Sequence, residues 1–270
     1  MIPKTPFGAL DEQPPEFAAL LVAALEMMAA SPEIQRVRQV ARDALAPVPG
    51  QRLLDAGCGA GEVARDLAAR VAPGGSVVAL DYARTNVEAA AQRHDGSAVE
   101  YVVGNVTALD FPDATFDGVR SERVLQHVDD PDRAIAELAR VTKPGGRVCL
   151  IDTDWDSVGA DGVPRELFVR LRDHAFSRVM VHHRDMGRTL RRRMLHAGLA
   201  EIRAQPVALY FGDPESAMAV LPMVSRLVPP QAGFIPDDMR DEWFAAVDAA
   251  GERGDFLATL TLWVVSGVRL

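Results

Sequence analysis

Hydrophobic residues in the first part of the chain recur at helical spacing. Residues 16–28 form a strongly apolar helical stretch. Ser31 and Pro32 then favour a new helix start, because serine can cap a helix and proline suits its first turn. This second helix is predicted to run to about Leu45, where the Pro-Val-Pro-Gly segment 47–50 ends it.

From Arg52 to Asp152 the pattern changes to short apolar runs separated by helical segments. The expected strands cover 53–55, 77–81, 99–103, 117–120 and 147–152, and the expected helices cover 62–71, 85–93 and 131–141. Strands of this length that alternate with helices indicate βαβ units. They predict an α/β fold with a parallel sheet that is covered on both faces.

The strict alternation stops after Asp152. We expect residues 155–196 to be mostly helical. A sixth strand is expected at 202–211, where Pro206 is tolerated only at a sheet edge or a bulge. The remaining expected elements are helices near 216–227 and 237–251 and a last strand at 256–268.

Composition narrows the class of protein. The chain has 270 residues, and its 29 lysines and arginines against 38 aspartates and glutamates give a formal net charge of −9. Because affinity for phosphate backbones comes mainly from clustered cations, this balance argues against a nucleic-acid partner. The sequence shows no apolar run long enough for a transmembrane helix and no signal peptide, so we expect no membrane insertion. The two cysteines, Cys58 and Cys149, do not form a CxxC pair, and the expected location is the reduced cytoplasm.

The turn after the first expected strand is the most informative segment. Gly57, Gly59 and Gly61 follow the strand and open a helix. Glycine suits such a turn because the backbone must bend tightly and let a ligand approach without a Cβ atom in the way. The free N–H groups of the following helix also face the ligand.

The acidic residues around this turn separate two kinds of ligand. A dinucleotide fingerprint needs a third glycine at position 62, where this chain has Glu62. Asp55 would repel a pyrophosphate but would suit the cationic α-amino group of S-adenosylmethionine (SAM). Asp81, at the end of the second strand, can accept hydrogen bonds from both ribose hydroxyls.

These and later stretches resemble the class I SAM-dependent methyltransferases of the UbiE-like group, or methyltransferase domain 11. The resemblance covers about residues 50–152. Its stretches are 53–62, 77–81, 102–106, 109–112, 116–117, 122–128 and 140–147. It implies a Rossmann-like, seven-stranded, mostly parallel sheet in the order 3-2-1-4-5-7-6 with an antiparallel last strand and a helical cap. It also implies SAM as cofactor and S-adenosylhomocysteine (SAH) as product.

The same resemblance implies a set of cofactor-binding residues. The aspartate and glycines of the turn would surround the methionine part of SAM, and Ser121 would present backbone atoms to it. Arg38 could pair with the methionine carboxylate. Asp81 would bind the ribose, and the adenine would meet Tyr82 and the pair 105–106. The full set is Arg38, Asp55, Gly57, Gly59, Gly61, Asp81, Tyr82, Asn105, Val106 and Ser121. The family more often has aspartate at position 105.

One histidine is a candidate catalyst. His127 follows the fourth strand, where the transferred methyl group should point, and a neutral imidazole there could take a proton from the acceptor. The alternative is a histidine that packs and shapes the pocket. The spacing of the other histidines gives no metal motif, and we expect no metal site; Cys58 is expected to be a packing residue.

Around the pocket we expect an N-terminal helical cap at 1–46 and a SAM-binding domain at 47–270 with lid inserts at about 155–197 and 213–252. Asp152 and Asp154 could border the pocket. Candidate lining residues are Phe7, Trp155, Phe176 and Phe211. The apolar N-terminal helix could pack within the chain or against a second copy, so a homodimer stays open.

The leading hypothesis is a methyltransferase that acts on an oxygen, nitrogen or carbon of a small-molecule acceptor, with secondary-metabolite tailoring or quinone synthesis among its compatible roles. An alternative is a SAM-binding protein without methyl transfer, either a cyclase or a ligand-binding module. An NAD-dependent oxidoreductase is a third reading, which Glu62 and Asp55 disfavour.

Overall fold

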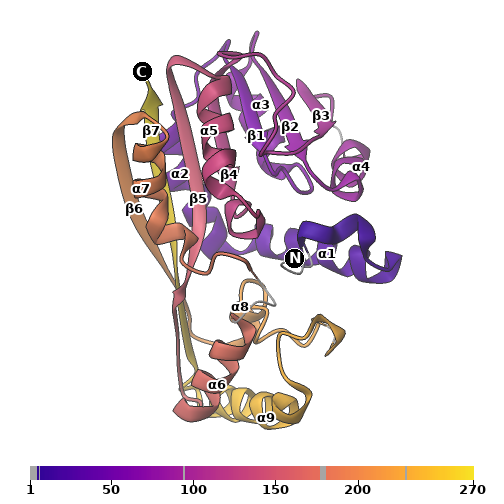
Figure 1. The fold of residues 1–270 in the computed structure, drawn as a ribbon. Coiled ribbons are helices and arrows are strands. Elements are labelled where there is room, and N and C mark those ends of the chain that lie inside the picture. The colour runs from indigo at the N-terminus through magenta and orange to yellow at the C-terminus, as the bar shows by residue number, and fades with distance from the viewer. Residues whose placement is uncertain (1–4, 6, 94, 177–180, 229) are drawn as a thin grey trace.

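The computed structural model describes residues 5, 7–93, 95–176, 181–228 and 230–270. Within them the strands form one seven-stranded sheet in the order β3-β2-β1-β4-β5-β7-β6 (Figure 1). The strands are β1 (Arg52–Ala56), β2 (Ser76–Asp81), β3 (Val99–Val103), β4 (Phe116–Glu122), β5 (Thr142–Asp161), β6 (Leu199–Phe211) and β7 (Leu257–Arg269). Strands β1 to β5 pair in parallel, and β7 runs antiparallel to both neighbours, so the expected order and direction are confirmed.

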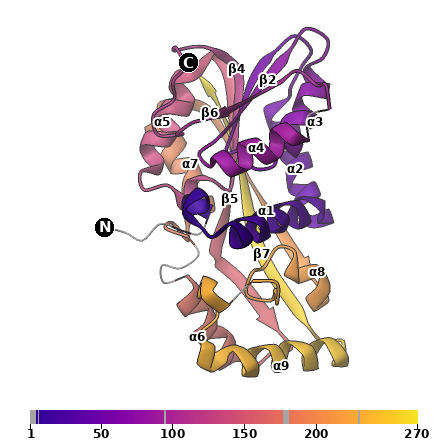
Figure 2. The ribbon, with the colours of Figure 1, turned by 90° about the vertical axis from the view of Figure 1, so that its right-hand side faces the viewer.

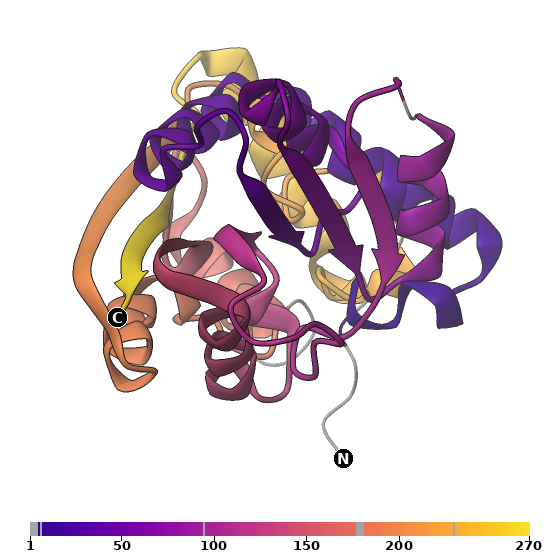
Figure 3. The same cartoon turned by 90° about the horizontal axis from the view of Figure 1, so that it is seen from above.

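Alternating side chains of the central strands feed two separate cores. Leu53 and Val77 pack on one face of the sheet, and Leu54 and Val78 pack on the other. Alternation places successive side chains on opposite faces, and both faces are apolar because helices cover both. The layers on the two sides of the sheet are visible from above in Figure 3.

One face is covered by α2 (Pro32–Leu45) and α3 (Glu62–Val71) and the other by α5 (Pro131–Val141) and α7 (Met186–His196). Helix α4 (Arg84–Gln92) packs on β2 and β3. Helix α1 (Pro15–Ala30) lies beside α2, and the 3-10 helix η1 (Phe7–Glu12) joins it; η2 (Leu125–His127) follows β4.

Strands β5, β6 and β7 continue past the rest of the sheet as a three-stranded arm. In that arm Gly159 pairs with Thr259, and Tyr210 pairs with the same residue from the other side. The arm carries a second lobe of α6 (Arg165–Ala175), α8 (Pro214–Met218), η3 (Pro230–Ala232) and α9 (Asp237–Arg253) (Figure 2). Helix α1 lies between this lobe and the central sheet in both side views.

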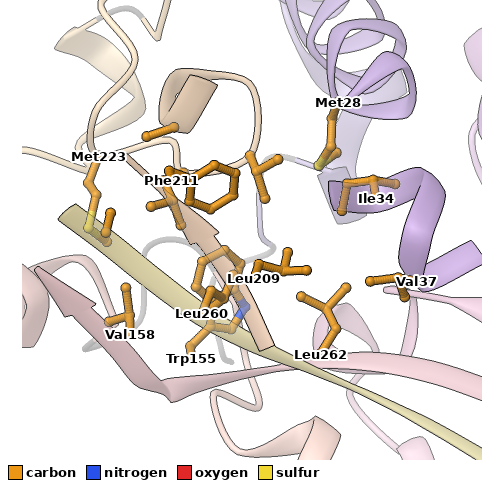
Figure 4. Close-up of a cluster of buried hydrophobic side chains, with 14 of the residues drawn as sticks. Met28, Ile34, Val37, Trp155, Val158, Leu209, Phe211, Met223, Leu260 and Leu262 are labelled. Carbon is orange, nitrogen blue, oxygen red and sulfur yellow. The ribbon is translucent and has the colours of Figure 1, made fainter. Parts of the chain in front are cut away.

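Apolar side chains join the two lobes. Met28 and Ile34 of the N-terminal helices meet Phe211 of β6 and Leu262 of β7 in one buried cluster, which reaches Met223 of the second lobe (Figure 4). The arm and α1 therefore share a continuous core, which holds the second lobe over the carboxyl ends of the central strands.

The structure corrects three of the local predictions. Residues 155–161 extend β5 instead of starting a helix: 159–161 pair with β7, which runs back alongside, and 155–158 lie in an irregularity of the register. The helix expected at 216–227 ends at Met218, before Pro222, which could not donate an intrahelical hydrogen bond. Ser31 occupies the N-cap position of α2, but its hydroxyl donates to Glu33 instead of accepting a backbone N–H. Pro206 lies on the edge strand β6, as expected.

Two further placements concern the cap and the expected lid. Helix α7, inside the segment 155–197, packs on the sheet through Met186, Leu190 and Met194. Helix α2 of the cap also packs on the sheet, chiefly against β5 and β7. Within the described residues no single helix is long and apolar enough to cross a membrane; α1 and α2 together meet the length and composition test but are bent by 72°.

Candidate functional site

A cavity of about 590 Å³ opens at the carboxyl ends of the central strands. This volume lies within the range of small-molecule sites. Its walls come from three parts of the chain: the turns after β1 to β4, the inward face of α1, and the second lobe from Met218 to Phe234. Ligands of open α/β sheets bind at this end, beside the point where the strand order reverses.

The glycine turn forms one end of the cavity. Gly57 and Gly61 have φ values of +81° and Gly59 of +53°, which favour glycine. At Gly57 an added Cβ atom would lie 2.0 Å from Cγ2 of Val124, so the turn and the segment after β4 approach too closely for any side chain. Gly57 and Gly59 line the cavity, whereas Gly61 caps α3 and does not.

Asp81 lies at this end as well, on the cavity wall. Its carboxylate accepts hydrogen bonds from the backbone N–H groups of Gly59 (2.9 Å) and Ala83 (3.0 Å) and from the amide of Asn86 (3.2 Å). Burial raises the pKa of Asp81, and these three donors oppose that rise. Because a carboxylate has about four acceptor positions, it can still take a further donor.

The expected adenine-binding residues also line the cavity. Tyr82 is 57% exposed and stands at the rim, and Val106 is buried in the wall. Asn105 lines the wall too, but its Oδ1 atom already accepts from the backbone N–H and the hydroxyl of Thr107. The structure therefore brings Tyr82, Asn105 and Val106 together with Asp81 at one end of the cavity.

Besides Gly61, three expected cofactor residues do not line the cavity: Arg38, Asp55 and Ser121 belong to a layer behind it. Asp55 pairs through Oδ1 with Arg120 (2.9 Å), and Arg120 reaches Glu122 (2.5 Å). Arg38 donates to the same Glu122 carboxylate at 3.1 and 3.2 Å. Ser121 donates its hydroxyl to the carbonyl of Ala56.

This ion-pair chain was not foreseen from the sequence, where Arg120 stands at the end of the expected fourth strand. Burial opposes ionisation of Glu122, but Arg38, Arg120 and Arg123 together lower its pKa to about 2. Burial raises the pKa of Asp55, against the attraction of Arg120. The short run Arg-Ser-Glu-Arg at 120–123 was the available signal, since charged residues at a buried strand end seldom occur without partners.

Arg123 is a second residue that the sequence did not single out. It lines the cavity with its side chain 14% exposed, and its backbone adopts a φ of +55°, which is unusual for arginine. One of its terminal nitrogens contacts the sulfur of Met28, and its Nε atom, 3.9 Å from Glu122, has no hydrogen-bond partner among the described residues. Burial lowers the pKa of Arg123, which Glu122 partly offsets.

His127 is one of the residues that line the cavity. Its ring nitrogens lie 3.1 Å from the hydroxyl of Thr5 and 3.0 Å from the amide nitrogen of Gln126. Burial, with the charges of Arg123 and His182, lowers the pKa of His127 to about 3. The imidazole is therefore neutral at physiological pH and is a weak base in this surrounding.

The other candidates divide between wall and core. Trp155 lines the cavity and donates to Gln126 (2.8 Å). Phe176 and Phe211 lie in the core and do not line the cavity, and the side chain of Phe7 lies outside the described part of the chain; Phe17 and Phe234 occupy the wall instead.

The two acids after strand five are held by protein groups. Asp152 is buried and accepts from the backbone N–H of Gln126, and Asp154 accepts from Arg188. Neither lines the cavity. Cys58 is buried, and burial raises the pKa of its thiol well above the usual value, as for a packing residue.

The residues present fit SAM by their chemistry. Asp55 keeps its Oδ2 atom buried and without a hydrogen-bond partner among the described residues, which leaves an acceptor near the glycine turn for an ammonium donor. The close approach at Gly57 leaves no room for a side chain, and Asp81 retains accepting capacity for a hydroxyl. No group of three His, Cys, Asp or Glu side chains in the described chain could hold a metal ion.

Comparison with known proteins identifies the family. A methyltransferase-domain family profile matches residues 54–150. An uncharacterized methyltransferase of Schizosaccharomyces pombe is 31% identical over 71% of this chain and 73% of its own length. The chain belongs to the class I SAM-dependent methyltransferases. The expected family and enzyme class are therefore confirmed.

Other relatives extend the likeness. This methyltransferase is 35% identical to an uncharacterized 37.1 kDa protein in transposon TN4556 of Streptomyces fradiae, over 90% of this chain and 70% of that protein. It is 32% identical to the demethylmenaquinone methyltransferase of Renibacterium salmoninarum over 56% of this chain. That match covers 65% of the relative, just under two thirds of its length.

Solved structures share the fold. Phosphoethanolamine N-methyltransferase 2 of Haemonchus contortus, in complex with phosphomonomethylethanolamine and SAH, superposes with a TM-score of 0.64 at 19% identity, over 97% of this methyltransferase and 59% of that chain. The [4+2]-cyclase SpnF superposes with a TM-score of 0.55 at 22% identity, over 85% and 79% of the two chains. At these identities the likeness concerns the fold alone.

Proposed function

We propose that this methyltransferase binds SAM at the glycine-turn end of the cavity and methylates a small molecule held between α1 and the second lobe. The observation that carries the proposal is the continuity of the cavity, which joins Gly57 and Asp81 at one end to apolar side chains of α1 and the second lobe at the other. A methyl group and its acceptor must meet in a site of this kind, shielded from water.

In this proposal Asp81 accepts from the ribose hydroxyls, while Tyr82, Asn105 and Val106 surround the adenine. The methionine end lies against the backbone of Gly57 and Gly59, behind which Asp55 holds a buried Oδ2 atom without a hydrogen-bond partner among the described residues. Arg38 and Ser121 act through their partners: Arg38 orients Glu122, and Ser121 ties β4 to β1 through the carbonyl of Ala56.

When bound, SAM supplies an electrophilic methyl group on a sulfonium, and its transfer leaves SAH. The chain's own residues position the acceptor and exclude water. His127, whose ring nitrogens already contact Thr5 and Gln126, shapes the acceptor site, and an acceptor that is already anionic needs no proton removed. The cap and the second lobe, including the parts of 155–197 and 213–252 that face the cavity, act as the lid.

The apolar walls favour an acceptor with an apolar body. Residues of this kind on α1 include Phe17, Leu21 and Met27, and the second lobe adds Val220 and Phe234. A demethylmenaquinone methyltransferase among the relatives is named for a quinone acceptor, which agrees with this expectation.

Calorimetric titration with SAH tests the cofactor site. Asp81→Asn should weaken SAH binding about tenfold or more, because hydrogen bonds to a charged group are worth about 1.5–3 kcal/mol. Asp66→Asn, on the exposed surface of α3, is the matched control and should leave the affinity unchanged. Absence of SAH binding by the wild type would overturn the proposal. Release of SAH from SAM with an acceptor would distinguish transfer from binding alone.

A further inference from the structure

The backbone and side chain of Arg123 are placed in an unusual way. The positive φ that places it costs backbone energy, and such strain persists at sites where it serves a function. Its guanidinium is directed to the cavity wall, where it meets the apolar Met28 of α1. No hydrogen bond from Arg123 to a carboxylate is present within the described chain, and its buried Nε atom has only a long ion pair of 3.9 Å with Glu122 and no hydrogen-bond partner.

Neighbouring acids do not satisfy this cation. Glu122 is 3.9 Å away and already receives hydrogen bonds from Arg38 and Arg120. Asp152 lies near enough to interact through charge, but its oxygens accept from the backbone N–H groups of Gln126 and Thr153. The ion-pair chain of Asp55, Arg120, Glu122, Arg38 and Arg123 contains three guanidinium groups and two carboxylates, so one positive charge remains in excess.

The geometry points to Arg123 as the anion-binding residue of the acceptor site, and therefore to an acceptor with an anionic group on an apolar body. The inference rests on the proposed function. It completes the acceptor chamber, by which we mean the part of the cavity between α1 and the second lobe. A buried guanidinium whose nearest carboxylate lies 3.9 Å away is incompletely compensated, and a carboxylate, phenolate, enolate or similar anion would satisfy it. The apolar body would lie along α1, whose exposed Leu20 stands at the rim of the cavity with Leu227 opposite in the second lobe.

The methionine carboxylate of SAM is the competing anion. Val124 packs against Gly57, whereas its neighbour Arg123 contacts Met28 on α1, which is the wall of the acceptor chamber. Met28 in turn packs in the buried cluster that joins α1 to the second lobe, which favours the acceptor as the source of the anion.

The test uses two fluorescent probes that share an apolar body but differ in charge. 8-Anilino-1-naphthalenesulfonate carries a sulfonate, and N-phenyl-1-naphthylamine does not. Both are titrated into SAH-saturated wild type, Arg123→Gln and the control Arg70→Gln, which removes an exposed arginine of α3 outside the cavity. We expect Arg123→Gln to weaken binding of the anionic probe about tenfold or more and to leave the neutral probe within about twofold. Arg70→Gln should change neither.

Three outcomes would overturn the inference. One is that Arg123→Gln weakens the binding of both probes equally. Another is that the wild-type protein binds the neutral probe but not the anionic one, a measurement that needs no variant. The third is a tenfold loss of SAH affinity in Arg123→Gln without loss of affinity for decarboxylated SAM, which would assign the guanidinium to the cofactor carboxylate. Wild-type protein that binds no SAH would instead refute the proposed function, so the two failures are distinguishable.

Discussion

Replacement of Gly57 by alanine tests how tightly the cofactor turn packs on the segment after β4. The new Cβ atom would lie 2.0 Å from Cγ2 of Val124 and 3.2 Å from its Cβ. Valine is stiff about χ1, so Val124 cannot turn away without strain or a shift of its backbone. Gly57 also has a φ of +81°, which an L-residue adopts at a cost.

The two effects can be sized separately. The left-handed backbone costs about 1–2 kcal/mol for a residue with a Cβ atom. Overpacking in a filled site costs about 1–3 kcal/mol. Gly57→Ala should therefore lower the free energy of unfolding by about 2–5 kcal/mol.

Gly74 provides a matched control. Its φ is also +81°, but an added Cβ atom would have nothing within 4 Å. Gly74→Ala should lower the free energy of unfolding by only the backbone part, about 1–2 kcal/mol. The difference between the two variants isolates the collision with Val124.

Urea denaturation followed by circular dichroism measures all the variants. Val124→Ala in the Gly57→Ala background should recover about 1–3 kcal/mol relative to additivity, because it removes the atoms that collide. SAH titration of the same variants reports whether the distorted turn still binds. If Gly57→Ala and Gly74→Ala lower the free energy of unfolding equally, within about 0.5 kcal/mol, the contact with Val124 adds no cost and the prediction is refuted.

Three further predictions concern buried ionisable side chains. Arg120→Met should lower the free energy of unfolding by about 3–5 kcal/mol, because it leaves Asp55 and Glu122 buried without their shared cation; a loss below 1 kcal/mol in urea denaturation would contradict this. Burial raises the pKa of Asp152 from 3.8 to about 7, so the folded state holds that proton more tightly than the unfolded state. The stability this proton contributes is complete below about pH 4 and is lost as the pH rises through 7, so stability should fall by about 1.4 kcal/mol per pH unit between these values, relative to Asp152→Asn; parallel pH profiles of the two proteins would refute it. Because burial lowers the pKa of His127 to about 3, its ring resonances in NMR should show no titration step between pH 5 and 8, and a midpoint in that window would show that the site is wetter than its packing indicates.

The local sequence pattern was sufficient to predict most of the central sheet. Glycines at 57, 59 and 61 and the acids at strand ends are short-range features, and the structure places Gly57, Gly59 and Asp81 on one cavity wall. Predictions failed where distant segments decide the conformation. Residues 155–161 belong to a strand whose last part, 159–161, pairs with β7, about a hundred residues later in the chain.

The ion pairs show the same limit within the site. Asp55 is recognisable as an acid next to the glycine turn, but its pairing with Arg120 depends on β4 lying beside β1. Arg38 could be chosen from its position on the N-terminal helix, yet only the packing of α2 on the sheet shows that it meets Glu122. Whether either residue also contacts SAM stays a prediction.

The amino-acid sequence by itself determined the class of fold, the strand order that its family resemblance implies and the kind of cofactor, because period, turn chemistry and motif spacing are properties of neighbouring residues. Only the tertiary structure decided which charges are paired, which aromatic side chains reach the cavity and where the guanidinium of Arg123 lies. Those facts depend on contacts between residues far apart in the chain, where burial removes water and makes each polar partner matter.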